Sequence, residues 1–142
     1  MTRILLSIFC TFCVSILLHA QENISLSITV DNIKEVKGIL EVYLYIGQEN
    51  FLEDDKEYAL HRFQVNNKKM TVTINNLPKN DYAYFLYQDI NSDQECNLNF
   101  LGIPKEPYGF SNNFKPVLSK PNFDQCKISG EEKVKTTTSL IY

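Results

Sequence analysis

Strict alternation of apolar and polar residues is the feature that most limits what this chain can fold into. Between Asn23 and Asp31 every second side chain is apolar, and the same period returns in residues 39–46 and 70–74. Successive side chains of a β-strand point to opposite faces, so a period of two is typical of strands with one buried face. These runs predict an all-β fold.

Further β-rich segments bring the predicted total to about seven strands. They lie at 58–65, 82–88, 123–128 and 133–142. The short turns between them, with no competing helical period, favour a β-sandwich or barrel.

Two turn pairs predict which of these strands are neighbours. Lys37-Gly38 is expected to join the first two strands as a hairpin, and Asn66-Asn67 the third and fourth, because glycine and asparagine tolerate the positive φ of tight turns. Between them, the acidic segment Gly47–Lys56 is expected to hold a short helical turn anchored by Phe51-Leu52.

Tyr82 opens the most aromatic strand, directly after a corner that begins at Leu77-Pro78. A tyrosine in this position is typical of the tyrosine corner of β-sandwiches, whose hydroxyl bonds back to nearby backbone. The alternative is an ordinary aromatic strand residue. Both interpretations stay open at this level.

The first twenty residues have the pattern of a secretory signal peptide. Arg3 precedes an apolar run from Ile4 to Leu18, and small Ala20 precedes polar residues. The run is too short for the ~20 residues that cross a bilayer. The sequence therefore predicts a leader at 1–20, a single domain at 21–142 without a membrane span, and export to the periplasm or the outside.

Charge and cysteine usage fit an exported domain. The chain carries 14 Lys and Arg against 17 Asp and Glu, which leaves no basic footprint for nucleic acid. Removal of the leader leaves two cysteines, Cys96 and Cys126, which predict one disulfide. Two buried free thiols are the alternative.

The stretch from Asp89 to Asn113 has no periodicity and reads as one long loop. Loops longer than about 12–15 residues are uncommon in compact domains unless they are functional or disordered. This loop contains the apolar anchors that disordered segments lack, namely Phe100, Leu101, Ile103, Tyr108 and Phe110. We therefore expect an ordered loop that packs on the domain.

The beginning of this loop spaces its oxygen-bearing residues as calcium loops do. Positions one, three, five, seven and nine are Asp89, Asn91, Asp93, Glu95 (through its carbonyl) and Asn97. Oxygen donors without histidine or cysteine favour calcium over zinc.

Two positions depart from an EF-hand. Gln94 stands where that loop has glycine, and Phe100 where it has a bidentate glutamate. Weak calcium binding is thus one hypothesis for this stretch. An Asx-rich turn held by its own hydrogen bonds is the other.

Catalytic chemistry is not favoured by the residues available. The predicted mature chain has a single histidine, His61, to which no role is assigned, and the loop's carboxylates show no defined separation. Whether the protein is an enzyme stays uncertain, leaning towards no. Six aromatic residues offer a platform for a sugar or peptide, with an ordinary place in the core and sheet surface as the alternative. They are Tyr82, Tyr84, Phe85, Tyr87, Tyr108 and Phe110.

The same stretch resembles a bacterial family known only as domain of unknown function 2141. The family pattern is roughly D-x-N-x-N-G-x-L-D-x-N-F-L-G-x-P-x-E-x-x-G-F-S-N-N, with an L-P-x-x-x-Y corner upstream and a P-x-F segment downstream. The chain matches it at Asp89, Asn91, Asn99, Phe100, Leu101, Gly102, Pro104, Glu106, Gly109, Phe110, Ser111, Asn112, Asn113, Leu77-Pro78, Tyr82, Pro121 and Phe123. It departs at Asp93, Gln94, Cys96 and Asn97.

The resemblance implies a seven-stranded β-sandwich of the transthyretin-like or immunoglobulin-like kind in the cell envelope, with no established activity. Together with the residue patterns it predicts a non-enzymatic protein that binds a ligand or partner, an envelope protein or a glycan, through the loop. The residues expected to do so are Asn99, Glu106, Tyr108, Phe110, Asn112 and Asn113. A carboxylate- or metal-dependent enzyme using the same loop and a purely structural envelope protein are the alternatives.

Overall fold

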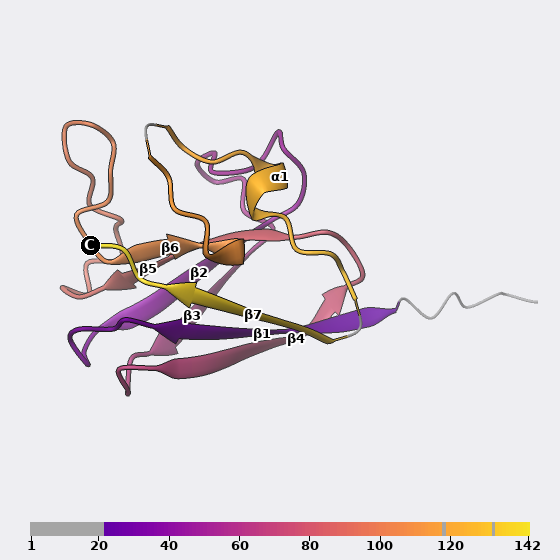
Figure 1. Ribbon diagram of the computed structural model, residues 1–142, viewed down its shortest axis with the longest axis horizontal. Coiled ribbons are helices and arrows are strands. Elements are labelled where there is room, and N and C mark those ends of the chain that lie inside the picture. The colour runs from indigo at the N-terminus through magenta and orange to yellow at the C-terminus, as the bar shows by residue number, and fades with distance from the viewer. Residues whose placement is uncertain (1–21, 118, 132) are drawn as a thin grey trace, which may run out of the picture.

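A computed structural model describes residues 22–117, 119–131 and 133–142 (Figure 1). The predicted leader at 1–20 lies outside these described residues. Seven strands, one α-helical turn and one 3-10 turn (Ser111–Asn113) occur in the described part, which confirms the all-β prediction. The strands are β1 (Asn23–Asp31), β2 (Ile39–Tyr45), β3 (Ala59–Gln64), β4 (Met70–Pro78), β5 (Ala83–Asp89), β6 (Tyr108–Phe110) and β7 (Lys133–Ser139).

The strands form two sheets around a shared apolar core. One sheet has the order β4-β1-β7 and the other the order β3-β2-β5-β6. The alternating apolar residues of β1 and β2 point into the same cluster, together with those of β4 and β5. Leu26, Ile28, Leu40 and Val42 are fully buried there, so the period of two seen in the sequence marks the faces on which the two sheets meet.

The predicted hairpins are wrong, because each connection carries the chain to the other sheet. β1 pairs with β4 and, in parallel, with β7, whereas β2 pairs with β3 and β5. The link after β1 turns at Asn32 and Gly38, both with positive φ. A Cβ on Gly38 would lie 2.0 Å from the carbonyl oxygen of Asp89, so this turn packs directly against the end of β5.

Two further segments differ from the predicted strands. Residues 123–128 begin with a helical turn, α1 (Phe123–Cys126), and not a strand. Its N-terminus has a capping box, in which Asn122 and Gln125 each bond the other's backbone N–H. The stretch predicted as one loop, Asp89–Asn113, contains strand β6, which pairs with the edge of β5. Within the described residues no helix is long and apolar enough to cross a membrane.

The outer face of the four-stranded sheet is covered as well as its inner face. β2 was expected to turn a polar face to solvent, but Glu41 is fully buried and Tyr45 is 5% exposed. Figure 1 shows three segments above this outer face, which are the loop 46–58, helix α1 and the long loop after β5. The inner face of the sheet is therefore covered by the core, and its outer face by loops and helix α1.

Tyr82 forms the bond expected of a tyrosine corner. Its hydroxyl donates to the carbonyl oxygen of Pro78 at 2.7 Å, and its ring is completely buried. The residue sits just before β5, where it makes an isolated bridge with Ile128. Of the two interpretations of this tyrosine, the geometry supports the corner.

We predict that Tyr82→Phe lowers the free energy of unfolding by about 1 kcal/mol, the net contribution of one hydrogen bond. Urea denaturation measures the change. Tyr45→Phe is the matched control, because the Tyr45 hydroxyl makes no hydrogen bond within the described part of the chain. Equal stability of Tyr82→Phe and wild type would show that the corner bond contributes nothing.

Candidate binding cleft

Aromatic rings cover the outer face of the four-stranded sheet. Tyr43 of β2 lies beside Phe85 and Tyr87 of β5, with ring centroids 6.3 and 6.0 Å apart. Phe85 in turn contacts Phe110 of β6 at 5.3 Å. Because these residues occupy neighbouring register positions on the same face, the strands themselves hold the rings as one continuous floor.

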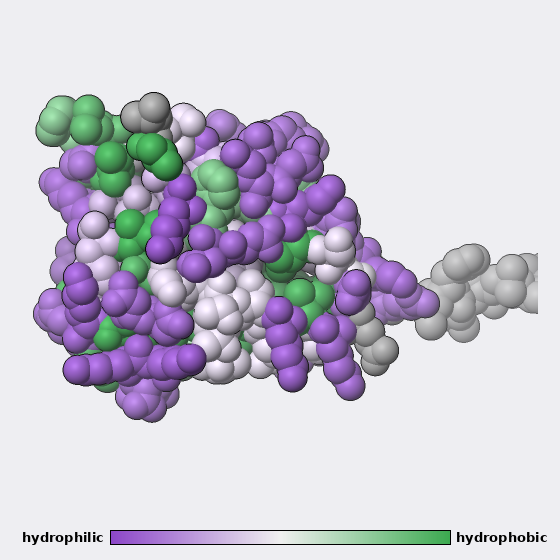
Figure 2. Space-filling model, in the orientation of Figure 1, coloured by the Kyte–Doolittle hydropathy of each residue, from purple (hydrophilic) through white to green (hydrophobic). Residues whose placement is uncertain are grey.

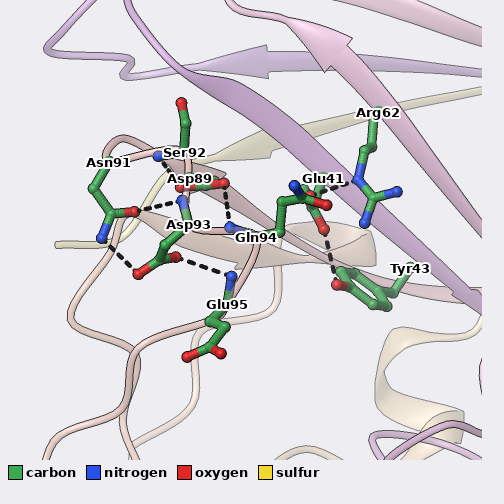
Figure 3. Close-up of polar contacts among 9 residues, drawn as sticks. All are labelled: Glu41, Tyr43, Arg62, Asp89, Asn91, Ser92, Asp93, Gln94 and Glu95. Carbon is green, nitrogen blue, oxygen red and sulfur yellow. Dashed lines mark hydrogen bonds and ion pairs between the residues drawn. The ribbon is translucent and has the colours of Figure 1, made fainter.

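An ion pair between exposed Arg62 and buried Glu41 lies at one end of this floor (Figure 3). Glu41 of β2 accepts from Arg62 Nε at 2.7 Å through one oxygen and from the Tyr43 hydroxyl at 2.8 Å through the other. Burial, followed by the bond to Glu41, raises the pKa of Tyr43 to about 12. Tyr43 is therefore a neutral hydrogen-bond donor at all physiological pH values.

The loop 46–58 forms the first wall. Phe51 anchors it by packing edge-on against Tyr45 at 5.5 Å and against Phe123 of α1 at 5.9 Å, as the sequence predicted for this residue. The loop consists of turns and contains no helix. Leu52 and four carboxylates line the cleft from this side, namely Glu53, Asp54, Asp55 and Glu57.

Asp89 positions the second wall from the end of β5. Its fully buried carboxylate accepts the backbone N–H of Ser92 at 2.6 Å and that of Gln94 at 3.0 Å (Figure 3). Ser92 and Gln94 both have positive φ, a conformation that costs a non-glycine residue roughly 1 kcal/mol or more. The carboxylate thus compensates a strained turn that sends the chain back over the aromatic floor.

Asp93 stabilises the same turn from the solvent side. One oxygen accepts the Glu95 N–H at 2.9 Å, and the other accepts the amide groups of Asn91 at 2.7 Å and Asn97 at 2.9 Å. The bond from Asn97, followed by that from Glu95, lowers the pKa of Asp93. The turn therefore keeps these bonds at neutral pH.

The tip of the long loop, residues 98–104, is a small hydrogen-bonded hairpin. Asn99 Oδ1 accepts the N–H groups of Leu101 and Ile103 at 2.9 and 3.1 Å, and Leu98 bridges Pro104. The tip exposes its apolar side chains, with Phe100 95% exposed. Figure 2 shows the hydrophobic atoms gathered at this projecting corner of the molecule. Contrary to expectation, Phe100, Leu101 and Ile103 do not anchor the loop on the domain. Tyr108 and Phe110, which were predicted with them, are buried as expected.

Floor and walls together enclose a cleft of about 730 Å³. Tyr43, Phe85, Tyr87 and Phe110 form its base, and the loop 46–58 lies on one side. The opposite side consists of residues 94–96, 98, 102 and 104 of the long loop. The cleft is thus lined by segments from widely separated parts of the sequence.

The protein matches the model of one known family over residues 28–138, described as "Uncharacterized protein conserved in bacteria (DUF2141)". The chain belongs to this family. The resemblance read from the loop and corner motifs is therefore confirmed. No curated protein matches the chain, and no solved structure does. The cleft must accordingly be interpreted from its own chemistry.

Most residues predicted to bind a ligand instead hold the backbone. Asn112 donates to the Lys127 carbonyl at 2.8 Å, and Asn113 accepts the Ser139 N–H at 3.0 Å. Asn99 organises the loop tip, and Tyr108 is a buried member of the cluster that contains Tyr87 and Phe110. Among the six predicted ligand-binding residues, Phe110 is the one that lines the cleft.

The predicted calcium ligands lie together at the base of the second wall. Asp89, Asn91, Asp93 and Asn97 bond to one another or to backbone N–H groups, which is the arrangement of the alternative, an Asx-rich turn. No cluster of three or more acidic, histidine or cysteine side chains suited to a metal ion occurs in the described ranges. Calcium binding stays a prediction, and the cleft does not depend on it.

The predicted disulfide is absent, since Cys96 and Cys126 are both free thiols. Cys96 lies near the end of β5, within reach of the charges of Glu106 and Glu41, whereas Cys126 lies on α1 near the beginning of that strand. A strand advances about 3.3 Å per residue, so the length of β5 separates the two cysteines. A disulfide needs Cα atoms within about 7 Å, which this separation prevents. Burial raises the pKa of each thiol to about 12.

Glu106 is buried beneath the second wall with only half of its carboxylate satisfied. Oε1 accepts the Ile90 N–H at 3.0 Å, but Oε2 has no partner in the described part of the chain. Burial, with the nearby charges of Asp89 and Asp93, raises the pKa of Glu106. Because the pKa of Glu106 is higher in the folded protein than in the unfolded chain, the protonated side chain contributes to stability. This contribution is fully present below the unfolded pKa and is lost as pH rises through the folded pKa.

We predict that Glu106→Gln melts at the same temperature as wild type near pH 4 and above it at pH 7. Glutamine keeps the acceptor for Ile90 and carries no charge to bury. Thermal melts at several pH values measure the difference. Glu95→Gln, at an exposed carboxylate of the same loop, is the control for the loss of one charge. A Glu106→Gln difference that is independent of pH would contradict the buried-charge account.

Sequence reasoning missed half of the cleft. Tyr43, Tyr45, Leu52 and Leu60 line it, whereas the predicted binding residues all lie in the loop after β5. The available signal was the aromatic character of β2 positions that the alternation assigns to solvent. Aromatic side chains on the second face of a strand whose first face is aliphatic indicate that both faces are covered.

Proposed function

We propose that this protein is a non-enzymatic, exported β-sandwich that binds a small ligand in the cleft over its four-stranded sheet. The observation that carries the proposal is the cleft itself. At about 730 Å³ it falls within the roughly 300–1,000 Å³ typical of small-molecule sites. Its floor is apolar and aromatic, and its walls supply the polar groups.

The rigidity of the cleft supports a binding role. Its base belongs to paired strands, and both walls are held by buried anchors, Phe51 on one side and Asp89 on the other. A site that is already in place loses little conformational entropy on binding. Recognition is also the common task of loops carried by a rigid scaffold.

We also propose that the two sheets form a sandwich of a known type. Sheets of three and four strands around one core, chain connections that switch sheets, and a tyrosine-corner bond at Tyr82 support an immunoglobulin-like or transthyretin-like sandwich. The leader pattern at 1–20 supports export to the periplasm or the outside. An envelope protein or glycan is the partner class proposed for the exposed loop tip.

The absence of tryptophan from the sequence makes a direct binding test available. We predict that Leu98→Trp, placed in the cleft wall, reports ligands by a saturable change in fluorescence. Leu98 is 51% exposed, so the larger side chain can be accommodated. Candidate ligands are sugars, amino acids, organic amines and fatty acids.

Val36→Trp is the matched control, because Val36 is 46% exposed and lies outside the cleft. A compound that changes the first signal and not the second, and that raises the melting temperature of wild type, supports binding. Turnover of a bound compound would support the enzyme alternative instead. Silence of both reporters across all four classes would contradict the proposal and favour a structural role.

A further inference from the structure

The charge of the cleft is strongly one-sided. Five carboxylates line it, Glu53, Asp54, Asp55 and Glu57 from one wall and Glu95 from the other, against a single cation, Lys120. Within the described residues none of the five takes part in an ion pair. Arg62, at the end of the floor, is already paired with Glu41. The walls therefore present uncompensated negative charge across the aromatic base.

The floor adds a second attraction for positive charge. The faces of aromatic rings carry negative partial charge, so a cation within about 6 Å of a ring centroid is attracted to it. Tyr43 and Phe85 are half-buried and line the cleft from below. Neither ring is already covered by a cation in the described structure, where the one such contact is Lys34 over Tyr142.

An unsatisfied polar group also lies in the floor. Tyr87 lines the cleft, and its hydroxyl is completely buried with no hydrogen-bond partner in the described part of the chain. The Tyr43 hydroxyl is near enough to influence its pKa, but the two do not meet the geometry of a hydrogen bond. Buried hydroxyls in native proteins nearly always find a partner, and a polar group of a ligand would supply one.

The geometry points to a small organic ammonium ion as the ligand of this cleft, an inference that rests on the proposed binding function and specifies its chemistry. The apolar body of such an ion would lie on Tyr43 and Phe85. Its positive charge would face the carboxylates of both walls. A bare metal ion would gain nothing from the aromatic floor, and a neutral sugar nothing from the wall charges.

Choline and 3,3-dimethylbutan-1-ol test this directly, because they have the same shape and differ in charge. With the Leu98→Trp reporter, choline is expected to bind at least about tenfold more tightly than the neutral alcohol, as one favourable cation–π and charge interaction would give. Its binding should weaken as salt is added, since exposed charges are screened.

Two substitutions separate the contributions. Asp54→Asn should weaken choline binding several-fold and leave the alcohol unchanged, while Glu49→Gln removes the same charge from the same loop outside the cleft and should change neither. Phe85→Leu should weaken choline binding by about tenfold while keeping an apolar surface. Far-ultraviolet circular dichroism and melting curves confirm that each variant is folded.

The outcomes distinguish this inference from the proposed function. Equal affinity for choline and the alcohol, or binding of glucose with no response to choline, would overturn the cationic ligand and leave the cleft as a binding site. Silence of the reporter towards choline, the alcohol and glucose alike would overturn both. Preference for choline that survives Asp54→Asn and Phe85→Leu unchanged would place the cation elsewhere and overturn the assignment.

Discussion

The buried carboxylate of Asp89 is the interaction on which the functional half of this structure depends. It stands at the end of β5, against the Gly38 turn that enters β2, and accepts two backbone N–H groups from a turn with unfavourable φ values. Hydrogen bonds to a charged acceptor contribute about 1.5–3 kcal/mol each, which is enough to offset the roughly 1–3 kcal/mol cost of a strained residue. Asp93 stabilises the turn internally, whereas Asp89 ties residues 92 and 94 to the end of β5. Loss of the Asp89 carboxylate is therefore expected to release a wall of the cleft.

The cleft exists because the four-stranded sheet is apolar on both faces. Its inner face meets the three-stranded sheet in a conventional core. Its outer face carries a second cluster, in which Tyr45, Phe51 and Phe123 tie the first wall and α1 to the strands. The second cluster does not cover the whole face, since Tyr43 and Phe85 stay half-buried. An aromatic surface rimmed by loops is what remains for a ligand.

Local patterns in the sequence predicted local structure well and long-range pairing poorly. Alternation in residues 23–31, 39–46 and 70–74 identified the inward-facing residues of three strands, because burial of one face requires an apolar residue at every second position. The hairpins failed, since Lys37-Gly38 and Asn66-Asn67 turn equally well whether the chain returns to the same sheet or crosses to the other. Strand β6 was hidden in the long loop because three residues are too few for a period.

The site was predictable only in part for a related reason. The Asp89 turn follows from Asx chemistry that is visible in the sequence, and Gln94 adopts there the positive φ for which the family pattern carries glycine. The wall from residues 46–58 was not predictable, because nothing local says that an acidic loop folds over a sheet face thirty residues downstream in the chain. The disulfide prediction was wrong because the spacing of two cysteines along a sequence does not give the distance between them in the fold.

The most direct test of this account is amide hydrogen exchange at Ser92 and Gln94, measured by NMR in wild type and in Asp89→Ala. The account predicts that both amides are protected in wild type, well beyond the amide of Phe100 at the exposed tip, and that Asp89→Ala abolishes their protection while the amides of β2 and β5 stay protected. Exchange at Ser92 and Gln94 as fast as at Phe100 in wild type would contradict it, because the wall of the cleft would then not be held by Asp89.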